Sequence, residues 1–346
     1  MQLPTIVGLA GDDTSTRIGM RAVDVRLSDD AELTKIGRFD EPRLTTGIAA
    51  QGDRVVVLGQ RGGVFTRSGA TLVREADDVS DARQAVDAGF LDDGRWVLAL
   101  PEPKRIQFED GPTVTLDAFD ERAWPGTLAT AGQTAFLSHV DGAFVVEASG
   151  GVTELFSSRR AELPAAITGD ASGVVLAAPE WADALRVLDA GTATPLGAHG
   201  VFGAQDATNA TEWRLGVPRR LLATTAGGIA ELATLGRRAG IALHVGATPT
   251  TVELPPGEYV DLVADGARAY AVSIDRGTYR SQLVTLEVGG GAPRIVAVDA
   301  WTGMAAGIAA TGGGVYVADR DDGVRIYDAT SDGLDLAAVV SLVEAP

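Results

Sequence analysis

The residues best suited to chemistry form an acidic turn near the C-terminus, Asp319-Arg320-Asp321-Asp322-Gly323. Calcium binds clustered carboxylates together with the carbonyl oxygens of a turn. Asp319, Asp321 and Asp322 are therefore candidate calcium ligands. The run lacks the further oxygen ligands and the distal glutamate of a complete calcium loop, so a polar hairpin turn is the interpretation we favour, and we expect no other cofactor.

The other side chains of catalytic type are dispersed. His139, His199 and His244 show no metal-ligand spacing, and we expect each of them to be structural. The chain has no cysteine, which excludes disulfides, thiolate nucleophiles and cysteine metal sites. Neither a nucleophile elbow nor a phosphate-binding or dinucleotide-binding glycine motif is found.

A third group of residues recurs just before a series of predicted strands, where carboxylates, arginines and aromatic residues stand together. Aromatic and arginine side chains are the usual anchors of protein interfaces. If all these segments lie on one face, they form a surface that binds a protein partner. The alternative is that each tryptophan fills the gap between neighbouring sheets. The candidate residues are Asp120, Glu121, Arg122, Trp124, Arg159, Arg160, Trp213, Arg214, Tyr259 and Trp301.

A repeated unit of short strands and turns must position these residues. In Ile308 to Asp328, apolar runs rich in β-forming residues alternate with turns that contain Gly-Gly or Asp-Gly. The same order starts again near Ile48, Phe90, Leu128 and Ile167. These starting points are roughly 40 residues apart, the length of one four-stranded propeller blade.

The repeats predict an all-β fold, a single-domain β-propeller over residues 1–346. Residues 1–44 read as a partial blade, and residues 45–346 as seven repeats of roughly 40 to 47 residues. The literal count is eight blades, and seven, the commoner number, stays open. We expect N- and C-terminal strands to close the ring together. The unit at about 200–256 is irregular: Ile229, Leu232 and Leu235 have helical spacing, although an ordinary outer strand is favoured.

The composition limits the partners and the location. The net charge of −18 argues against nucleic acid and anionic membranes as ligands. No apolar run approaches the ~18 residues that span a bilayer, and no signal peptide is evident, so we expect a cytoplasmic protein. Lys35 and Lys104 are the only lysines. An acidic, lysine-poor surface fits a salt-adapted organism, and a GC-rich genome explains the same bias.

Residues Val315 to Asp328 resemble the LVIVD-type and related propeller repeats, in which two apolar residues, Ala-Asp and a Gly mark two adjacent strands. The unit at Gly52 to Thr66 lacks the aspartate. The resemblance implies a propeller and an interaction role, and it assigns no catalytic residues.

The sequence therefore favours a non-catalytic binding or scaffold protein whose partner is another protein. Two alternatives stay open. One is a propeller hydrolase or lyase that uses acidic residues at the channel mouth, with calcium assistance. The other is a structural subunit of a larger particle such as a phage or a surface appendage.

Overall fold

Seven four-stranded antiparallel sheets make up most of the described chain, and we name them sheets A to G in chain order. The computed structural model describes residues 25–27, 33–35, 45–75, 79–101, 104–116, 125–139, 142–157, 166–170, 173–177, 184–189, 192–202, 219–246, 248–289, 291–320 and 322–342. Each sheet is built from four consecutive strands, and strand order in space follows strand order in the chain.

The first four sheets have the following strands. Sheet A contains β3 (Thr45–Gln51), β4 (Arg54–Gly59), β5 (Gly63–Ser68) and β6 (Thr71–Arg74). Sheet B contains β7 (Asp87–Phe90), β8 (Trp96–Pro101), β9 (Lys104–Phe108) and β10 (Thr113–Thr115). Sheet C contains β11 (Pro125–Ala131), β12 (Thr134–His139), β13 (Gly142–Glu147) and β14 (Val152–Ser157). Sheet D contains β15 (Ala166–Asp170), β16 (Gly173–Ala177), β17 (Ala184–Asp189) and β18 (Thr192–Ala198).

The last three sheets follow the same plan. Sheet E contains β19 (Arg219–Thr225), β20 (Gly228–Leu235), β21 (Arg238–His244) and β22 (Thr250–Leu254). Sheet F contains β23 (Glu258–Asp265), β24 (Arg268–Asp275), β25 (Arg280–Glu287) and β26 (Arg294–Thr302). Sheet G contains β27 (Ala305–Thr311), β28 (Gly314–Asp319), β29 (Gly323–Thr330) and β30 (Gly333–Val340). A short 3-10 helix, η1 (Ser80–Arg83), lies between sheets A and B, and β1 (Val25–Leu27) pairs with β2 (Leu33–Lys35).

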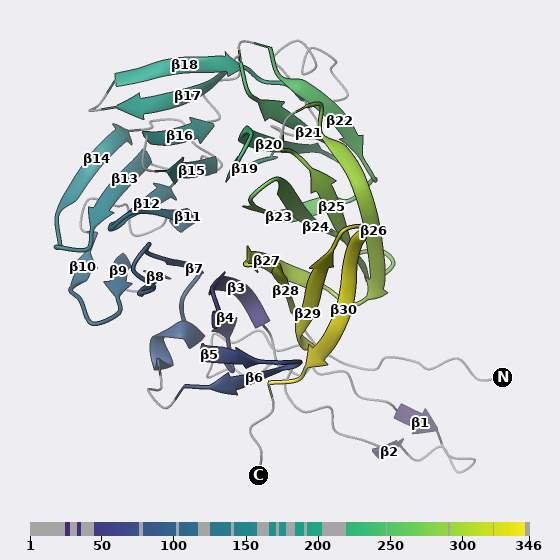
Figure 1. The fold of residues 1–346 in the computed structure, drawn as a ribbon. Helices are drawn as coiled ribbons and strands as arrows, with labels where there is room; N and C mark the ends of the chain where they lie inside the picture. Colours follow the sequence, from purple (N-terminus) through teal and green to yellow (C-terminus); the bar gives the residue numbers. More distant parts are fainter. Residues whose placement is uncertain are drawn as a thin grey trace.

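The sheets stand side by side in a ring (Figure 1). The first strand of each sheet is innermost and contacts the first strand of the next sheet, and β27 contacts β3 to close the circle. In several sheets, the turn between the first and second strands contains a residue with a positive φ angle, and this residue is a glycine. Gly52, Gly132, Gly266 and Gly312 have φ of 57°, 60°, 60° and 56°.

The core consists of apolar layers between neighbouring sheets. Both faces of each sheet are covered, so the second strands read as continuous apolar runs rather than as alternating ones. Val55 to Leu58, Val97 to Leu100 and Val315 to Ala318 are all buried. Across the closing junction, Val55 and Val57 of sheet A belong to one cluster with Tyr316 and Ala318 of sheet G.

The prediction of an all-β propeller arrangement is confirmed, and two finer expectations are wrong. The count of eight fails because β1 and β2 form a separate two-stranded sheet that pairs with no described strand of the ring. The expected closure by exchanged strands fails too. All four strands of sheet G come from residues 305–340, so contacts between complete sheets close the ring.

The irregular unit is an ordinary sheet. Ile229, Leu232 and Leu235 lie in β20, the second strand of sheet E, and the helical spacing was misleading. The strand is favoured because its neighbours β19 and β21 pair with it along its whole length. Its residues from Ala230 to Leu235 are all buried, and Ala230 and Leu232 pack in one cluster with residues of sheet F.

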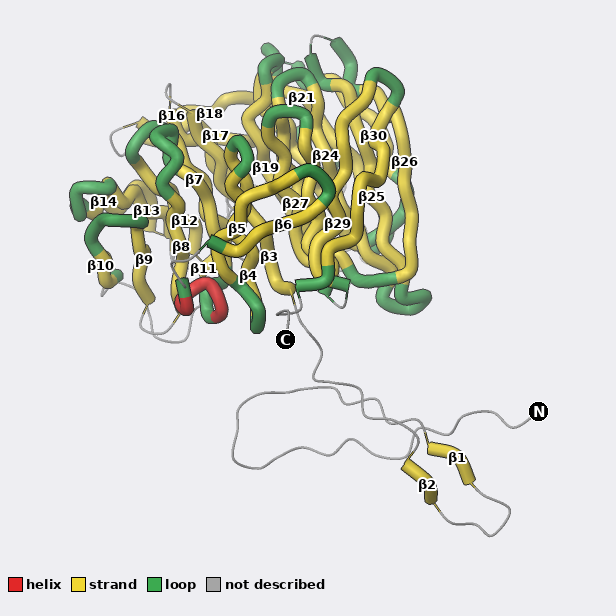
Figure 2. The backbone as a smooth tube through the Cα atoms, turned by 60° about the horizontal axis from the view of Figure 1, so that its bottom comes forward, coloured by secondary structure: helices red, strands yellow, loops and turns green. Residues whose placement is uncertain are grey.

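The ring has two different faces. On the hairpin face, the first strand of each sheet turns into the second and the third into the fourth. On the connection face, each sheet's outermost strand leads to the innermost strand of the next. Figure 2 shows η1 on the connection face, opposite the β5–β6 turn. Four consecutive connections are long, 75–86, 116–124, 158–165 and 199–218, whereas 255–257 and 303–304 are short.

No helix among the described residues is long and apolar enough to cross a membrane.

Candidate functional site in the central channel

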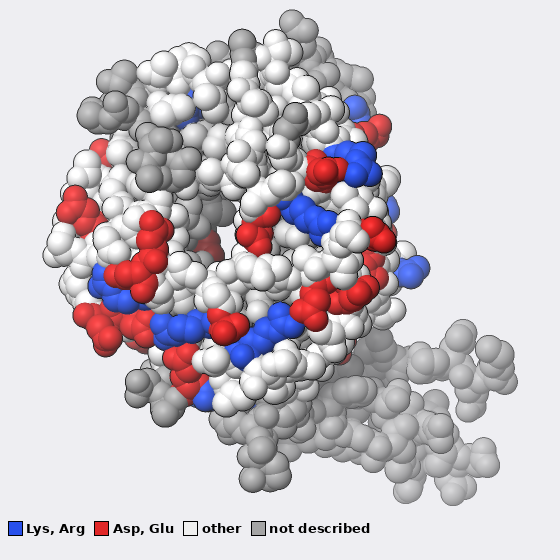
Figure 3. All heavy atoms as spheres, in the orientation of Figure 1, with Lys and Arg blue, Asp and Glu red and all other residues white. Residues whose placement is uncertain are grey.

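A cavity of about 290 Å³ occupies the centre of the ring and is lined by the innermost strands of all seven sheets. Figure 3 shows its opening at the middle of the hairpin face. The lining is mostly alanine, leucine, isoleucine and threonine. Among the described lining residues, the two ionisable ones are Asp87 at the start of β7 and Asp261 in β23.

Asp87 and Asp261 have the same geometry in different sheets. Asp87 Oδ1 accepts the N–H of Ala88 at 2.8 Å, and its Oδ2 accepts the N–H of Leu128 in sheet C at 2.7 Å. Asp261 Oδ1 accepts the N–H of Leu262 at 2.8 Å, and its Oδ2 accepts that of Ile308 in sheet G at 2.8 Å. Each aspartate thus ties the innermost strand of its own sheet to that of the next.

The channel environment changes the acidity of Asp87. Removal from bulk water raises the pKa of the Asp87 carboxyl to about 7, and the negative charge of Asp261 adds to the effect. The N–H groups of Leu128 and Ala88 act in the opposite direction but do not cancel it. Asp87 therefore exchanges a proton near neutral pH. A carboxyl of this kind can act as a general acid or base.

A second polar centre is buried in sheet E, around Glu231 of β20. Glu231 has no exposed surface. Its Oε1 accepts a hydrogen bond from His199 Nδ1 at 2.6 Å, and its Oε2 accepts one from His244 Nε2 at 2.9 Å. Arg220 Nη1 also donates to Oε1. The structure thus brings together two of the three histidines that the sequence shows as dispersed.

The charge of Glu231 is compensated from several sides. Burial alone would raise the pKa of its carboxyl, but the hydrogen bonds from His199 and His244 and the charge of Arg220 hold it well below its usual range. His244 Nδ1 has no hydrogen-bond partner in the described part of the chain. Glu231 is thus a stably ionised anchor.

The centre fastens residues 199–202 to sheet E. Arg220 donates from Nη1 to the carbonyl of Val201 at 3.1 Å and from Nη2 to that of Phe202 at 2.8 Å, and the Gly200 N–H reaches Glu231 Oε2 at 3.3 Å. Gly200 lies so close to the sheet that a Cβ would stand 2.4 Å from that of Ala242. The cluster therefore holds the start of connection 199–218.

Most of the predicted partner-binding face lies outside the described residues: Asp120, Glu121, Arg122, Trp124, Arg159, Arg160, Trp213 and Arg214. The two described members are interior. Tyr259 has no exposed surface, and its hydroxyl donates to the carbonyl of Pro255 at 3.0 Å. Trp301 is 8% exposed and packs between sheets F and G, which is the gap-filling role that the sequence left as an alternative.

The acidic turn is built into the same junction. Asp319 is fully buried, and its Oδ2 accepts hydrogen bonds from Trp301 Nε1 at 2.7 Å and from Arg325 Nε at 2.8 Å. Its Oδ1 accepts the N–H of Met304 at 3.2 Å. Asp322 pairs with Arg325, and Asp321 is outside the described residues. Among the described residues, no group of three or more His, Asp or Glu side chains could hold a metal ion. His139 ends β12, and its side chain is also outside the description.

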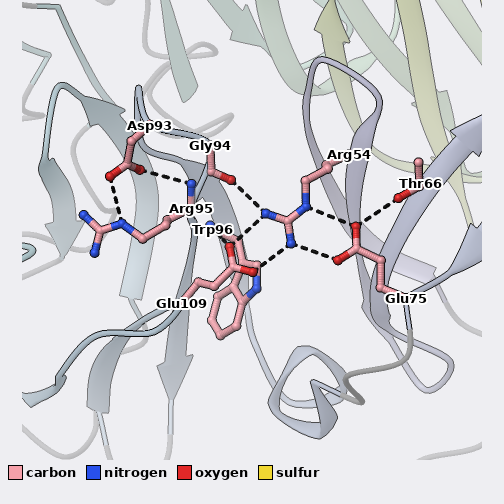
Figure 4. A network of polar contacts seen from close by, with 8 residues as sticks. All are labelled: Arg54, Thr66, Glu75, Asp93, Gly94, Arg95, Trp96 and Glu109. Atoms are coloured by element: carbon pink, nitrogen blue, oxygen red, sulfur yellow. Dashed lines mark hydrogen bonds and ion pairs between the residues drawn. The ribbon is translucent and has the colours of Figure 1, made fainter.

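Ion pairs join neighbouring sheets on the hairpin face, where charged side chains gather over sheets A, B, F and G (Figure 3). Arg54 of sheet A binds Glu75 through Nη2 at 2.9 Å and Glu109 of sheet B at 2.8 Å, and its Nη1 reaches the carbonyl of Gly94 at 2.9 Å (Figure 4). Arg67 similarly joins Asp328 of sheet G at 2.5 Å. On this face, ion pairs between side chains of neighbouring sheets therefore help to hold the ring together.

No protein-family model and no curated protein match the chain. Several solved structures resemble it at low identity. PorZ, an essential bacterial surface component of the type-IX secretion system of Porphyromonas gingivalis, is 12% identical with a TM-score of 0.57. The match covers 88% of this chain and 39% of PorZ, so this chain spans well under half of that protein.

Virginiamycin B lyase of Staphylococcus aureus, in a catalytically inactive form with quinupristin, is 12% identical with a TM-score of 0.53, over 82% of this chain and 94% of that one. Saccharomyces cerevisiae Sqt1 is 10% identical with a TM-score of 0.51, over 85% of both chains. The fold is a β-propeller. Identities this low establish the architecture alone, and this architecture serves both binding and catalysis.

Proposed function

We propose that this propeller is a non-catalytic binding protein that engages a protein partner through part of its connection face. The observation that carries the proposal is the grouping of the long connections. Those that leave sheets A, B, C and D are consecutive around the ring, whereas those that leave sheets E and F are short. Long loops on a rigid scaffold are where binding sites are usually found.

The positions of the predicted residues support the same surface. Asp120, Glu121, Arg122 and Trp124 belong to connection 116–124, and Arg159 and Arg160 belong to connection 158–165. Trp213 and Arg214 belong to connection 199–218. The two predicted residues near the short connections, Tyr259 and Trp301, are the ones that the fold buries. The proposed surface therefore comprises these four connections, and we name it the long-loop arc.

Replacement of the anchors tests this proposal. The native chain is immobilised and compared with a Trp124→Ala/Arg159→Ala variant for the protein it retains from extract of its source cells. We expect the variant to lose a specific partner more than 10-fold, since one anchor contributes about 2 kcal/mol or more. The control is Arg294→Ala, whose exposed side chain lies at the hairpin-face end of β26. Equal retention by all three proteins contradicts the proposal.

One observation favours an enzyme as the second candidate. Asp87 faces the cavity with a pKa of about 7, and titratable groups of this kind gather at active sites. A hydrolase or lyase of this type would use Asp87 as acid or base, with calcium as an assisting cation. Calcium at millimolar concentration would then raise the melting temperature, and Asp87→Asn would remove that rise. No change with calcium favours the binding protein.

A further inference from the structure

Two turns lie against the short connection from sheet F to sheet G and place Tyr279, Arg280 and Arg320 around it. The Gly303 N–H donates to the carbonyl of Tyr279 at 3.1 Å, and the Arg320 N–H donates to that of Met304 at 2.9 Å. Arg280 follows Tyr279 directly, at the start of β25. All three side chains are exposed on the connection face.

Arg280 and Arg320 differ from every other arginine whose side chain the structure describes, because they alone have no hydrogen bond, ion pair or ring contact. The described acidic side chains at this end of sheets F and G already have partners: Glu258 with Arg276, Asp275 with Arg237, Asp299 with the Tyr327 hydroxyl, and Asp319 and Asp322 with Arg325. In a chain of 47 acidic and 29 basic residues, two unpaired guanidinium groups therefore stand beside one connection, available to an external anion.

Tyr279 combines a strained backbone with an exposed ring. Its φ is 55°, in the left-handed region that a bulky residue rarely adopts. The other two described residues of this kind have local explanations, since Asp110 is of a type that tolerates the region and Phe202 packs in a core cluster. The Tyr279 ring is 43% exposed, so packing does not offset its strain. Strain of this kind gathers at binding sites.

The chemistry of the three side chains fits an acidic protein segment. Guanidinium groups bind carboxylates through paired hydrogen bonds, and exposed tyrosine and arginine are frequent anchors of protein interfaces. The net charge of −18 disfavours a long polyanion such as nucleic acid. The Ser281 hydroxyl also donates to the Gly303 carbonyl at 3.0 Å, so the backbone that carries these side chains is already ordered before a partner binds.

From these observations we propose that Tyr279, Arg280 and Arg320 form a docking surface for an acidic segment of a protein partner, and we name it the F–G patch. Arg280 and Arg320 pair with carboxylates of the segment, and Tyr279 packs against its apolar side chains. The F–G patch lies on the connection face outside the long-loop arc, so it does not depend on the proposed function.

A labelled peptide in which glutamate and leucine alternate probes the F–G patch directly, and the same peptide with glutamine in place of glutamate is its neutral counterpart. Fluorescence anisotropy at physiological salt should show at least ~10-fold tighter binding of the glutamate peptide to the native chain. Arg280→Gln/Arg320→Gln should remove this preference. Arg95→Gln/Arg294→Gln removes the same charge from the hairpin face and should keep the preference.

Tyr279→Gly separates binding from folding. Glycine adopts the left-handed conformation without strain, so the melting temperature should stay level or rise while the glutamate peptide binds at least ~5-fold more weakly. A lower melting temperature would assign Tyr279 to the fold and remove it from the F–G patch.

Two results overturn the proposal as a whole. One is equal binding of the two peptides by the native chain, or an equal loss of preference in both double variants. The other is stronger competition by inorganic phosphate than by free glutarate at equal concentration, because the arginines would then select phosphate groups rather than carboxylates.

Discussion

Glu231 and Asp87 are both carboxylates removed from bulk water, and their surroundings give them opposite properties. Glu231 is contacted by Arg220 and by two histidines, so it stays ionised and its pKa falls. Asp87 receives backbone N–H groups but no cation in the described structure, and Asp261 adds a second negative charge to the channel. Burial by itself raises the pKa of a carboxyl in both cases. The comparison shows that the groups that donate hydrogen bonds to the carboxylate decide whether its pKa ends above or below the usual value. The first group anchors a connection, and the second can exchange a proton.

Loss of the Glu231 charge should have the largest effect. Glu231→Gln leaves Arg220 buried without its counter-charge, and breaking a buried pair in this way costs about 3–5 kcal/mol of unfolding free energy. Urea denaturation measures the loss. Glu253→Gln, at an exposed position on β22, is the matched control and should change stability by about 0.5 kcal/mol or less. A similar small loss in both variants would show that Glu231 is not held as an ionised anchor.

The pH dependence of stability should separate the two carboxylates. The folded state holds the Asp87 proton more tightly than the unfolded chain, whose aspartate pKa is about 4. Asp87 therefore lowers the unfolding free energy progressively as pH rises from about 4 to about 7. Glu231 has a depressed pKa, so its contribution is present above about pH 4.5 and is lost as pH falls further.

Asp87→Asn isolates the first of these effects. We define the difference as the unfolding free energy of the native chain minus that of the variant. This difference should fall from pH 4 to pH 7 and stay constant above pH 7. Urea unfolding at half-unit pH steps provides the measurement. A difference that does not vary with pH would mean that Asp87 titrates normally in the channel.

The partly exposed ion-pair network around Arg54 should matter less than Glu231 or Asp87. Arg54→Lys keeps the charge but loses the paired contacts to Glu75 and Glu109, which we expect to cost about 1 kcal/mol. The network is partly exposed, so multimolar KCl should reduce the difference between variant and native chain. Thermal unfolding at low and high KCl tests both points, and a difference that grows with salt would refute the screening argument.

The smallest effect is expected at Asp322. Its side chain is 49% exposed and pairs with Arg325 at 3.1 Å, so Asp322→Asn should change the unfolding free energy by about 0.5 kcal/mol or less. Calorimetry of the variant provides the measurement. A loss above 2 kcal/mol would place Asp322 in the same class as Glu231.

The repeats were readable from the sequence because each sheet is one continuous stretch of chain. Ile48, Phe90, Leu128 and Ile167 lie in the innermost strands β3, β7, β11 and β15. The ring closure could not be read in this way, since it depends on contacts between complete sheets. The expectation that N- and C-terminal strands close the ring together rested on strand-like patterns, which do not encode which strands pair.

The polar centres were harder to predict because their members are distant in the chain. His199 and Glu231 are 32 positions apart, and nothing in either segment marks the other as a partner. Asp87 and Asp261 did leave a signal: each stands directly before the apolar residues of an innermost strand. A position-by-position alignment of the repeats would have placed both at the same point of the unit.

Among the described strands, none is exchanged at the closing junction, and this has consequences for how the chain folds and how it can be rearranged. Every described sheet is complete as soon as its own stretch has been synthesised, so the sheets can form one after another at short sequence separations, and the closure between β27 and β3 comes last. The same modularity allows new chain ends to be introduced at any long connection without dividing a sheet. The whole sheet is therefore the unit in which the ring folds and in which its chain order can be permuted.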